Sequence, residues 1–358
     1  MEKITYDIQF TVPAFLGDAE QQSAWRTPPF KALIQHWWRV AVAQEHGYDW
    51  CKIRESEGKL FGHAWLDNGS WAMRSRVRIK LDQQKAGELL SWQQSPSNQR
   101  ITHPEVKDRN TGKLRPMAPE TYLAYGPLHF RDGLAHNTPA IKANEKNQLT
   151  LVYPKQDQAT FLQVMQLVHW FGALGGRSRN AWGSVCLQSD AITKSYDLQK
   201  IKSITRPLAD CLQLDWPHAI GSDEHGLLIW QTPEWENWQL VIKDLAITKI
   251  NFRTALAFPN ARPGGFENRH LLAYPVTNHS INSWGNTGRL ANQIRFKVAK
   301  TANNKFVGII VHLPCGLPKE MAQTLRNPPP INQQIEIWQK IHHSLKKQAE
   351  PHLTRISQ

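Results

Sequence analysis

Hydrophobic and polar residues alternate along the start of the chain. Over residues 4–12 hydrophobic side chains occupy every second position, and mostly polar side chains lie between them. This period of two predicts a strand with one buried face. Residues 28–44 begin with two prolines and then repeat hydrophobic residues at helical spacing, which predicts a helix that starts at the prolines.

A second alternating segment covers residues 71–81 and predicts the most informative strand. Hydrophobic and small side chains point to one side, and the positions between them hold four cations, Arg74, Arg76, Arg78 and Lys80. Alternate residues of a strand lie about 6.6–6.8 Å apart, close to the phosphate repeat of an extended nucleic acid. An ordinary exposed strand mixes charge signs, so the segment favours a track for a nucleic acid backbone, with a solvated face as the alternative.

The next segments complete a first domain. Residues 82–146 are rich in Pro, Asn, Gly and Gln and show little periodicity, which predicts a long insertion. A strand, a helix, a Gly/Arg-rich loop and a closing strand are predicted at residues 148–154, 159–171, 172–181 and 182–188. The order strand, helix, strand, strand, helix, strand is that of the ferredoxin-like unit, which RNA-recognition modules also use.

Beyond about residue 205 a second, less regular set of elements is predicted. It contains a strand, a helix, a strand pair that turns at two asparagines, and a last helix, at residues 227–232, 235–256, 294–313 and 335–347. We therefore expect an α+β fold with two domains, of which the first has the ferredoxin-like (βαββαβ) order. Their expected bounds are 1–205, with the insertion at about 82–146, and 206–358.

Composition narrows the class of protein. The length of 358 residues agrees with two domains, and a hydrophobic fraction of 41% excludes wholesale disorder. Lys and Arg exceed Asp and Glu by 13, so a polyanionic partner is expected. Fifteen tryptophans serve either a packed core or a surface on which bases stack.

No hydrophobic stretch is long enough for a membrane span, and Glu2 and Asp7 stand where a signal peptide would be apolar. We therefore expect a cytoplasmic protein. The four cysteines are far apart and lack the spacing of zinc ligands, so we expect reduced, mostly buried thiols and neither a metal nor another cofactor.

A glycine-rich loop follows the helix predicted at residues 159–171. Gly175 and Gly176 would let its backbone approach a ligand closely, and Arg177 and Arg179 would supply planar cations for phosphates. A helix stop built from glycines is the alternative, but it does not explain the arginines. Trp182 closes the loop, where its ring would either stack on a base or pack in the core.

Cations on the first helix are further candidates for RNA contact. Arg26 precedes the helix, and Lys31, Gln35 and Arg39 form a ridge along it with His36 at the border. A solvated helix face explains the ridge equally well. A lone histidine such as His36 is more often a structural or surface residue than a general acid.

The loop at residues 260–270 pairs glycines with Arg262 and Arg269 and so echoes the first glycine-rich loop. We expect a second contact with RNA or with another subunit there. The sequence contains no HExxH motif, no nucleophile elbow and no spaced acidic metal set, so it offers no positive signature of an enzyme.

Several short segments together resemble the RAMP superfamily of CRISPR proteins. More narrowly, they resemble the large two-domain RAMP subunit of type III-B, or Cmr-type, effector complexes. The segments are FTVPAFLGDAEQ, WRTPPFKALIQHWWR, RESEGKLFG, YLAYGP and LGGRSRNAWGSV, in this order along residues 10–185. Looser matches, RHLLAYPVT and RLANQIRFKV, follow in the second half.

The resemblance implies tandem ferredoxin-like domains and a glycine-rich loop that touches guide RNA (crRNA). It also implies other RAMP subunits as partners, and a position at the end of the complex away from the guide's 5′ tag. The implied role is RNA binding in antiviral defence, not cleavage. Gln35 stands where the family's helix often has an arginine, so one expected cation is missing.

We therefore expect a non-catalytic subunit that clamps guide RNA, target RNA or both. One alternative is a RAMP-fold endoribonuclease, with His36 as general acid or with Asp108 or Asp132 in an acidic site. The other alternative is a stand-alone protein that binds single-stranded RNA by charge and stacking.

Overall fold

In the computed structural model, the alternating residues at the start of the chain form strand β1 (Glu2–Phe10), as predicted. Tyr6 and Ile8 are buried while Thr5 and Asp7 are exposed, so one face of the strand enters the core. The structure describes residues 1–20, 22–64, 72–89, 92, 99–108, 110–130, 134–258 and 264–356.

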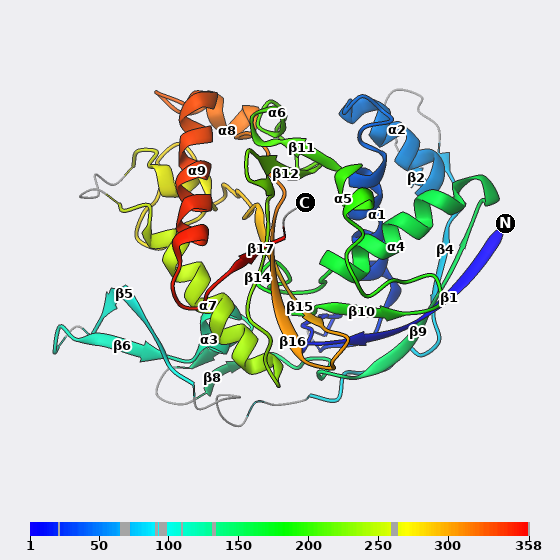
Figure 1. Ribbon diagram of the computed structural model, residues 1–358, viewed down its shortest axis with the longest axis horizontal. Helices are drawn as coiled ribbons and strands as arrows, with labels where there is room; N and C mark the ends of the chain where they lie inside the picture. Colours follow the sequence, from blue (N-terminus) through cyan, green and yellow to red (C-terminus); the bar gives the residue numbers. More distant parts are fainter. Residues whose placement is uncertain are drawn as a thin grey trace. The chain divides into compact units, whose positions relative to one another are not determined.

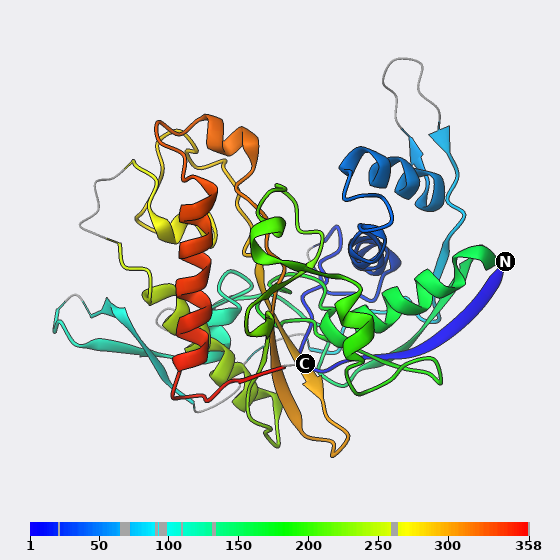
Figure 2. The ribbon, with the colours of Figure 1, turned by 45° about the horizontal axis from the view of Figure 1, so that its top comes forward.

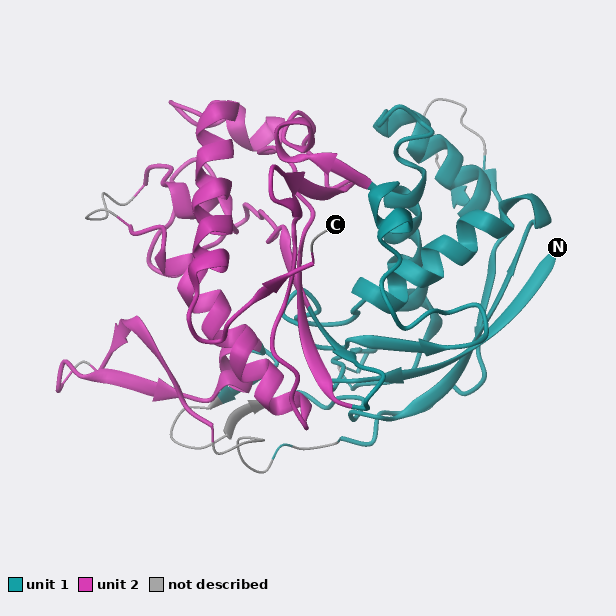
Figure 3. Ribbon diagram, viewed as in Figure 1, with its two compact units in different colours: residues 1–94, 124–204, 297–304 teal, residues 95–123, 205–296, 305–358 magenta. Residues whose placement is uncertain are grey.

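The chain divides into two compact units, which Figure 3 colours separately. Unit 1 comprises residues 1–94, 124–204 and 297–304, and unit 2 comprises residues 95–123, 205–296 and 305–358. The chain passes from unit 1 to unit 2 at Thr205, next to the expected boundary. Residues 95–123 of the expected insertion group with unit 2, where helix α3 (Pro119–Leu123) packs on helix α7 (Trp238–Thr254).

Unit 1 is built on a four-stranded sheet in the order β10-β1-β9-β4, in which all neighbours are antiparallel. Helices α1 (Thr27–Val42) and α4 (Gln158–Phe171) lie on the same side of this sheet in Figures 1 and 2. Phe161 of α4 stacks on Tyr153 of β9 with ring centroids 4.6 Å apart, so the core lies between helices and sheet. The remaining strands are β4 (Arg78–Leu81), β9 (Lys146–Tyr153) and β10 (Val185–Gln188).

The strand predicted at residues 71–81 is shorter than expected. Only its last four residues form β4, and Ala72–Met73 form β3, which pairs with β2 (His63–Ala64). Between them the backbone N–H of Arg76 donates to the Leu60 carbonyl, 2.9 Å away, near the end of helix α2 (Trp50–Phe61). This bond to α2, a helix that the sequence pattern did not predict, replaces a bond within the sheet.

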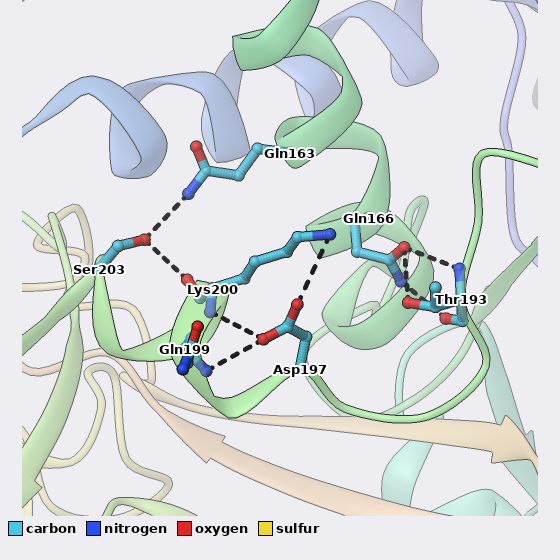
Figure 4. Close-up of polar contacts among 7 residues, drawn as sticks. All are labelled: Gln163, Gln166, Thr193, Asp197, Gln199, Lys200 and Ser203. Carbon is cyan, nitrogen blue, oxygen red and sulfur yellow. Dashed lines mark hydrogen bonds and ion pairs between the residues drawn. The ribbon is translucent and has the colours of Figure 1, made fainter.

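The segment after β10 is tied to helix α4 by side-chain hydrogen bonds, which Figure 4 shows. The side-chain amide of Gln166 donates to the Thr193 carbonyl at 2.8 Å and accepts from the Thr193 backbone N–H at 2.9 Å. Asp197 caps helix α5 (Leu198–Lys202) by accepting from two of its backbone N–H groups. We assign this cluster to the fold, because its contacts close the end of unit 1 onto α4.

Lys297 is a buried cation in unit 1, with 1% of its surface exposed. Its Nζ donates to the carbonyls of Val168 at 3.0 Å and Val185 at 2.6 Å, and also to that of His169. Val168 and His169 lie in the last turn of α4, where the ammonium faces the negative end of the helix dipole; the Val168 carbonyl also accepts from the backbone N–H of Gly172 at 2.8 Å. Burial lowers the pKa of Lys297 to about 7.

Unit 2 contains a sheet in the order β15-β16-β14-β17, in which β14 is antiparallel to both of its neighbours. Residues 297–300 of β15 are the exception, since they group with unit 1. The predicted strand pair is present, and Asn304 in its turn has the positive φ of 61° that asparagine tolerates. The helices predicted at residues 235–256 and 335–347 are α7 and α9 (Ile331–Lys347). The strands are β14 (Ile229–Gln231), β15 (Ile294–Lys300), β16 (Phe306–His312) and β17 (Thr354–Arg355).

Shorter elements complete both units. In unit 2 the hairpin of β5 (Ile101–Lys107) and β6 (Leu114–Met117) projects beyond α7 in Figures 1 and 2. A three-stranded sheet in the order β11-β12-β13 lies elsewhere in that unit. The other elements are β7 (Leu128–Phe130), β8 (Leu134–Asn137), η1 (Lys155–Asp157), β11 (Thr205–Pro207), α6 (Leu208–Cys211), β12 (Ile220–Asp223), β13 (Gly226–Leu227), η2 (Asn268–Leu271) and α8 (Lys319–Gln323).

Tryptophan side chains are buried in the cores of both units. The largest fully buried side chains include Trp25, Trp37, Trp182, Trp230 and Trp338. The cysteines are unpaired, and Cys211 and Cys315 are buried, but Cys51 is exposed and Cys186 is half-buried, which corrects the expectation of mostly buried thiols. None of the helices in the described ranges is both long and apolar enough to cross a membrane.

Candidate nucleic-acid interface

The basic edge of unit 1, defined as Arg74, Arg76, Arg78 and Lys80, lies along and just before the edge strand β4. All four side chains are exposed, and the residues that alternate with them turn inward, with Val77 and Leu81 buried. The predicted alternation in burial therefore holds from Arg74 to Leu81, although the regular strand begins only at Arg78, whereas Met73, predicted on the inner side, is 40% exposed. Within the described residues none of the four forms an ion pair within 4 Å or a side-chain hydrogen bond, although the charge of Arg76 is near enough to lower the pKa of Asp157.

The register of the sheet adds one cation, Lys3, that the sequence did not single out. Arg78 pairs with Val152, which pairs with Lys3, so all three side chains lie on the outer face, away from α1 and α4. Lys3 is exposed and lies two strands from Arg78, about 10 Å at the usual strand spacing. In sequence Lys3 was only a polar position in an alternating strand, and no local signal relates it to the basic edge.

The middle of this outer face is polar. The hydroxyl groups of Thr5 and Thr150 hydrogen-bond at 3.0 Å, and the Gln148 side-chain amide donates to Asp7 at 2.8 Å. Thr150 also pairs with Lys80 of the basic edge. The outer face thus combines cations at the β4 side with hydroxyl groups, which can donate to phosphate oxygens, and with the carboxylate of Asp7, which accepts from Gln148.

The glycine-rich loop, residues 172–181, is held against residues 15 and 16. Gly176 donates from its backbone N–H to the Phe15 carbonyl at 2.8 Å. Gly175 has a φ of 92°, and a Cβ at this position would lie 2.6 Å from the same carbonyl oxygen. The close approach that the glycines allow is therefore made to the protein's own backbone. Arg177 and Arg179 remain exposed on this loop.

Trp182 is fully buried, which corrects its assignment as a candidate RNA contact. Its ring packs against Phe15 and Trp92, with centroid distances of 5.1 and 5.8 Å. A ring enclosed on all sides cannot offer a face to a base, so Trp182 anchors the loop in the core. The sequence left both roles open, because a tryptophan next to glycines suits either.

The two cations of the ridge predicted on α1 form hydrogen bonds inside the protein. Arg39 donates from Nε and Nη2 to both carboxylate oxygens of Glu57 on α2, each at 2.7 Å. Lys31 donates from Nζ to the carbonyl of Phe61, the last residue of α2, at 2.9 Å. The two cations thus join α1 to α2. Arg26 and His36 are half-buried, and the His36 ring lies edge-on to Trp37 at 5.3 Å.

The prediction that Arg269 contacts RNA or another subunit is also wrong, since only 3% of the residue is exposed. Its Nη1 and Nη2 donate to the two carboxylate oxygens of Glu105 at 2.7 and 2.6 Å, and its Nε donates to the Leu256 carbonyl. The guanidinium also lies 4.4 Å from the centre of the Phe258 ring. Arg269 is therefore a structural residue of unit 2. Arg262 lies outside the described residues.

Of the acidic candidates for catalysis, the structure describes only Asp108. Asp108 is in the turn between β5 and β6, where it accepts hydrogen bonds from the backbone N–H groups of Asn110 and Thr111 and from the Thr111 hydroxyl. These bonds lower the pKa of Asp108 and account for an aspartate at this turn. Asp132 lies outside the described residues. The described part of the chain contains no cluster of three or more metal-ligating side chains.

Two histidines that the sequence did not connect form a buried pair in unit 2. His312 and His342 hydrogen-bond through their facing ring nitrogens at 3.0 Å, and His342 lies 4.0 Å from Asp223. Burial lowers the pKa of His342 to about 3 and lowers that of His312 as well. Arg355 bonds to Asp223 at 2.6 Å and occupies its carboxylate. The pair is enclosed and neutral, so it serves the core.

Similar proteins are found only by comparison with solved structures. No protein-family model and no curated protein matches the sequence. The crystal structure of Cmr1 from Pyrococcus furiosus, in its apo form, has a TM-score of 0.50 and 14% identity, and the match covers 100% of this chain and 99% of that chain. A chain of the type III-B Cmr-β complex, solved by cryo-electron microscopy with cognate target RNA, has a TM-score of 0.48 and 11% identity over 95% of this chain and 98% of that chain.

The match to Cmr1 spans both chains almost completely, so it concerns the whole arrangement of elements and not one domain. The chain therefore has the fold of Cmr1, and the resemblance to the large Cmr-type RAMP subunit that its motifs indicated is confirmed at the level of the fold.

Proposed function

We propose that this protein is a non-catalytic RNA-binding subunit of a type III-B CRISPR effector complex. The basic edge carries this proposal, because it presents four exposed cations, of which only Arg76 has an acidic neighbour, Asp157, and such a run suits an RNA backbone. The motifs shared with the Cmr-type subunit and the full-length fold match to Cmr1 support the same role. The partners would be guide and target RNA and other RAMP subunits, with this subunit at the end away from the guide's 5′ tag.

Strand order supports two tandem ferredoxin-like domains. In unit 1 the strands β1, β4, β9 and β10 alternate with α1 and α4 along the chain and lie in the order fourth, first, third, second. In unit 2 the strands β14, β15, β16 and β17 alternate with α7 and α9 and lie in the same order when read from β17. Each sheet is thus a split βαβ arrangement with a fourth strand at one edge.

RNA binding by the basic edge is tested with a double variant, Arg74→Ala/Arg78→Ala. Affinity for single-stranded RNA, measured by fluorescence anisotropy over a range of salt concentrations, should fall for every sequence. The salt dependence should decrease by about 0.7 slope units per lost phosphate contact. An unchanged slope would overturn the assignment of the basic edge.

A matched control is Lys59→Ala/Lys200→Ala, which removes two exposed cations from the same unit. Both lysines already pair with acids, Lys59 with Glu55 and Lys200 with Asp197. If this control reduced the slope as much as the double arginine variant, general charge and not the basic edge would explain binding.

Assembly and the absence of cleavage need separate tests. Purification of the tagged protein from its native cell should recover other RAMP proteins and small RNAs that share a repeat-derived 5′ tag. Recovery of the protein alone, or with RNA lacking that tag, would favour a stand-alone RNA-binding protein. On a denaturing gel, the purified protein should leave both a guide precursor and a matched target RNA intact.

A further inference from the structure

Tyr125 is an exposed aromatic residue in a protein that buries most of its large rings. The residue is 59% exposed, more than any other large aromatic in the described part of the chain. It lies in the YLAYGP segment, which the resemblance singled out but to which the RNA contacts above give no role. A single exposed ring is ordinary, so its surroundings decide whether it is a binding site.

The backbone and a neighbouring histidine hold the Tyr125 ring in place. The Leu128 backbone N–H donates to the Ala124 carbonyl at 3.1 Å, which closes a turn around Tyr125 and Gly126. The ring of His129 lies 5.2 Å from that of Tyr125 at an interplanar angle of 85°. This edge contact supports one side of the Tyr125 ring while most of its surface stays open to solvent.

A guanidinium group lies over Gly126, the residue that follows Tyr125. A Cβ at Gly126, the next residue, would be only 2.9 Å from Nη2 of Arg177, so the Arg177 side chain occupies the space over Gly126. Partial burial there lowers the pKa of Arg177, and the nearby Tyr125 opposes this shift. Both residues belong to unit 1.

The backbone of Arg177 is unusual for an arginine. Its φ is 60°, in the left-handed region that residues with a side chain rarely adopt. Such a conformation persists only where the surroundings require it, and strained residues often lie at binding sites. From this backbone conformation the guanidinium lies over Gly126, the chain neighbour of Tyr125, while the residue stays exposed.

We propose that Tyr125 and Arg177 form a nucleotide-binding site, in which an RNA base stacks on the tyrosine ring and an adjacent phosphate pairs with the guanidinium. Tyrosine offers a flat face that accepts any base, and arginine binds phosphate through two N–H groups at once. The inference rests on the proposed function and adds a base contact to the backbone contacts of the basic edge.

The test compares two single-stranded probes of equal length, an oligoadenylate and an oligomer of abasic ribose phosphates. The wild-type protein should bind the oligoadenylate more tightly, because only that probe can stack. Tyr125→Ala should weaken oligoadenylate binding by roughly 5- to 150-fold, the range that corresponds to loss of one stacked base. The variant should leave binding of the abasic probe unchanged, and Tyr125→Phe, which keeps the ring, should behave as wild type.

Arg177→Gly should instead weaken binding of both probes and reduce the salt slope by about 0.7, since it removes one phosphate contact. Equal loss for both probes on Tyr125→Ala, or no loss for either, would overturn the stacking site while the contacts of the basic edge stand. If the wild-type protein bound neither probe in low salt, the proposed function itself would fail. Thermal unfolding of each variant checks that exposed Tyr125 is dispensable for the fold.

Discussion

The basic edge of unit 1 and Arg269 of unit 2 both supply arginine side chains, but those of the basic edge are exposed and that of Arg269 is buried in an ion pair. Arg74 and Arg78 are exposed and have no ionic partner among the described residues. Arg269 is buried, and its guanidinium donates hydrogen bonds to Glu105 and to a backbone carbonyl. Both were candidates for RNA contact from sequence. The difference is an acid within reach, which decides whether an arginine is available to a ligand or belongs to the fold.

Lys297 is a third case, since it is buried with carbonyls and not with an acid. Carbonyl groups satisfy its hydrogen bonds but do not cancel its charge, so burial disfavours the ammonium form. The three cations therefore differ in what compensates their charge: water, a carboxylate or backbone dipoles. Stability measurements can separate these cases.

The largest effect is expected from Arg269→Ala. Removing the guanidinium leaves Glu105 without its partner and opens space beside Phe258. Because the Glu105 side chain is 46% exposed, water partly replaces the lost partner, and we expect a loss of about 3 kcal/mol, the low end for a broken buried pair. Unfolding in urea measures this loss in the free energy of unfolding. Arg78→Ala should change the free energy of unfolding by less than about 0.5 kcal/mol, and equal effects would contradict the comparison.

A pH-dependent effect is expected for Lys297→Met. The folded pKa of about 7 lies below the ordinary value of 10.5, so between these values the unfolded chain holds more protons. Wild-type stability should therefore gain a contribution as pH rises from 7 to 10.5, with a slope of up to about 1.4 kcal/mol per pH unit, and below pH 7 the penalty should be constant.

The variant should lack this contribution, so the difference in unfolding free energy between wild type and Lys297→Met should change with pH only above about 7. Lys155→Met, which removes an exposed lysine of the same unit, should leave the pH profile as in wild type. A pH-independent difference for Lys297→Met would mean that this lysine does not titrate as its burial requires.

A small effect on stability is expected from Arg177→Gly. Glycine relieves the positive φ of 60° but makes the unfolded chain more flexible, and the two effects oppose each other. The free energy of unfolding should change by less than about 1 kcal/mol. A large loss would show that Arg177 supports the loop and not a ligand, which would sharpen the contrast with Arg269.

Much of the fold was predictable because burial of one face leaves a periodic pattern in the sequence. β1, α1, α4, α7, α9 and the β15–β16 hairpin all carry such a pattern. Helix α2 was missed, and with it the Arg76 bond that shortens the predicted strand at residues 71–81. The grouping of residues 95–123 with unit 2 also has no local signal, because it depends on packing against α7.

The candidate site divides in the same way. The sequence by itself determined the one-sided run of cations in the basic edge and the glycines of residues 172–181, because both are local patterns. Only the tertiary structure decided that Arg39 and Arg269 are taken by Glu57 and Glu105, 18 and 164 positions away, and that Arg177 lies over Gly126 beside Tyr125. The free energy of an ion pair or a ring contact depends on distance in space, and no period along the chain records that distance.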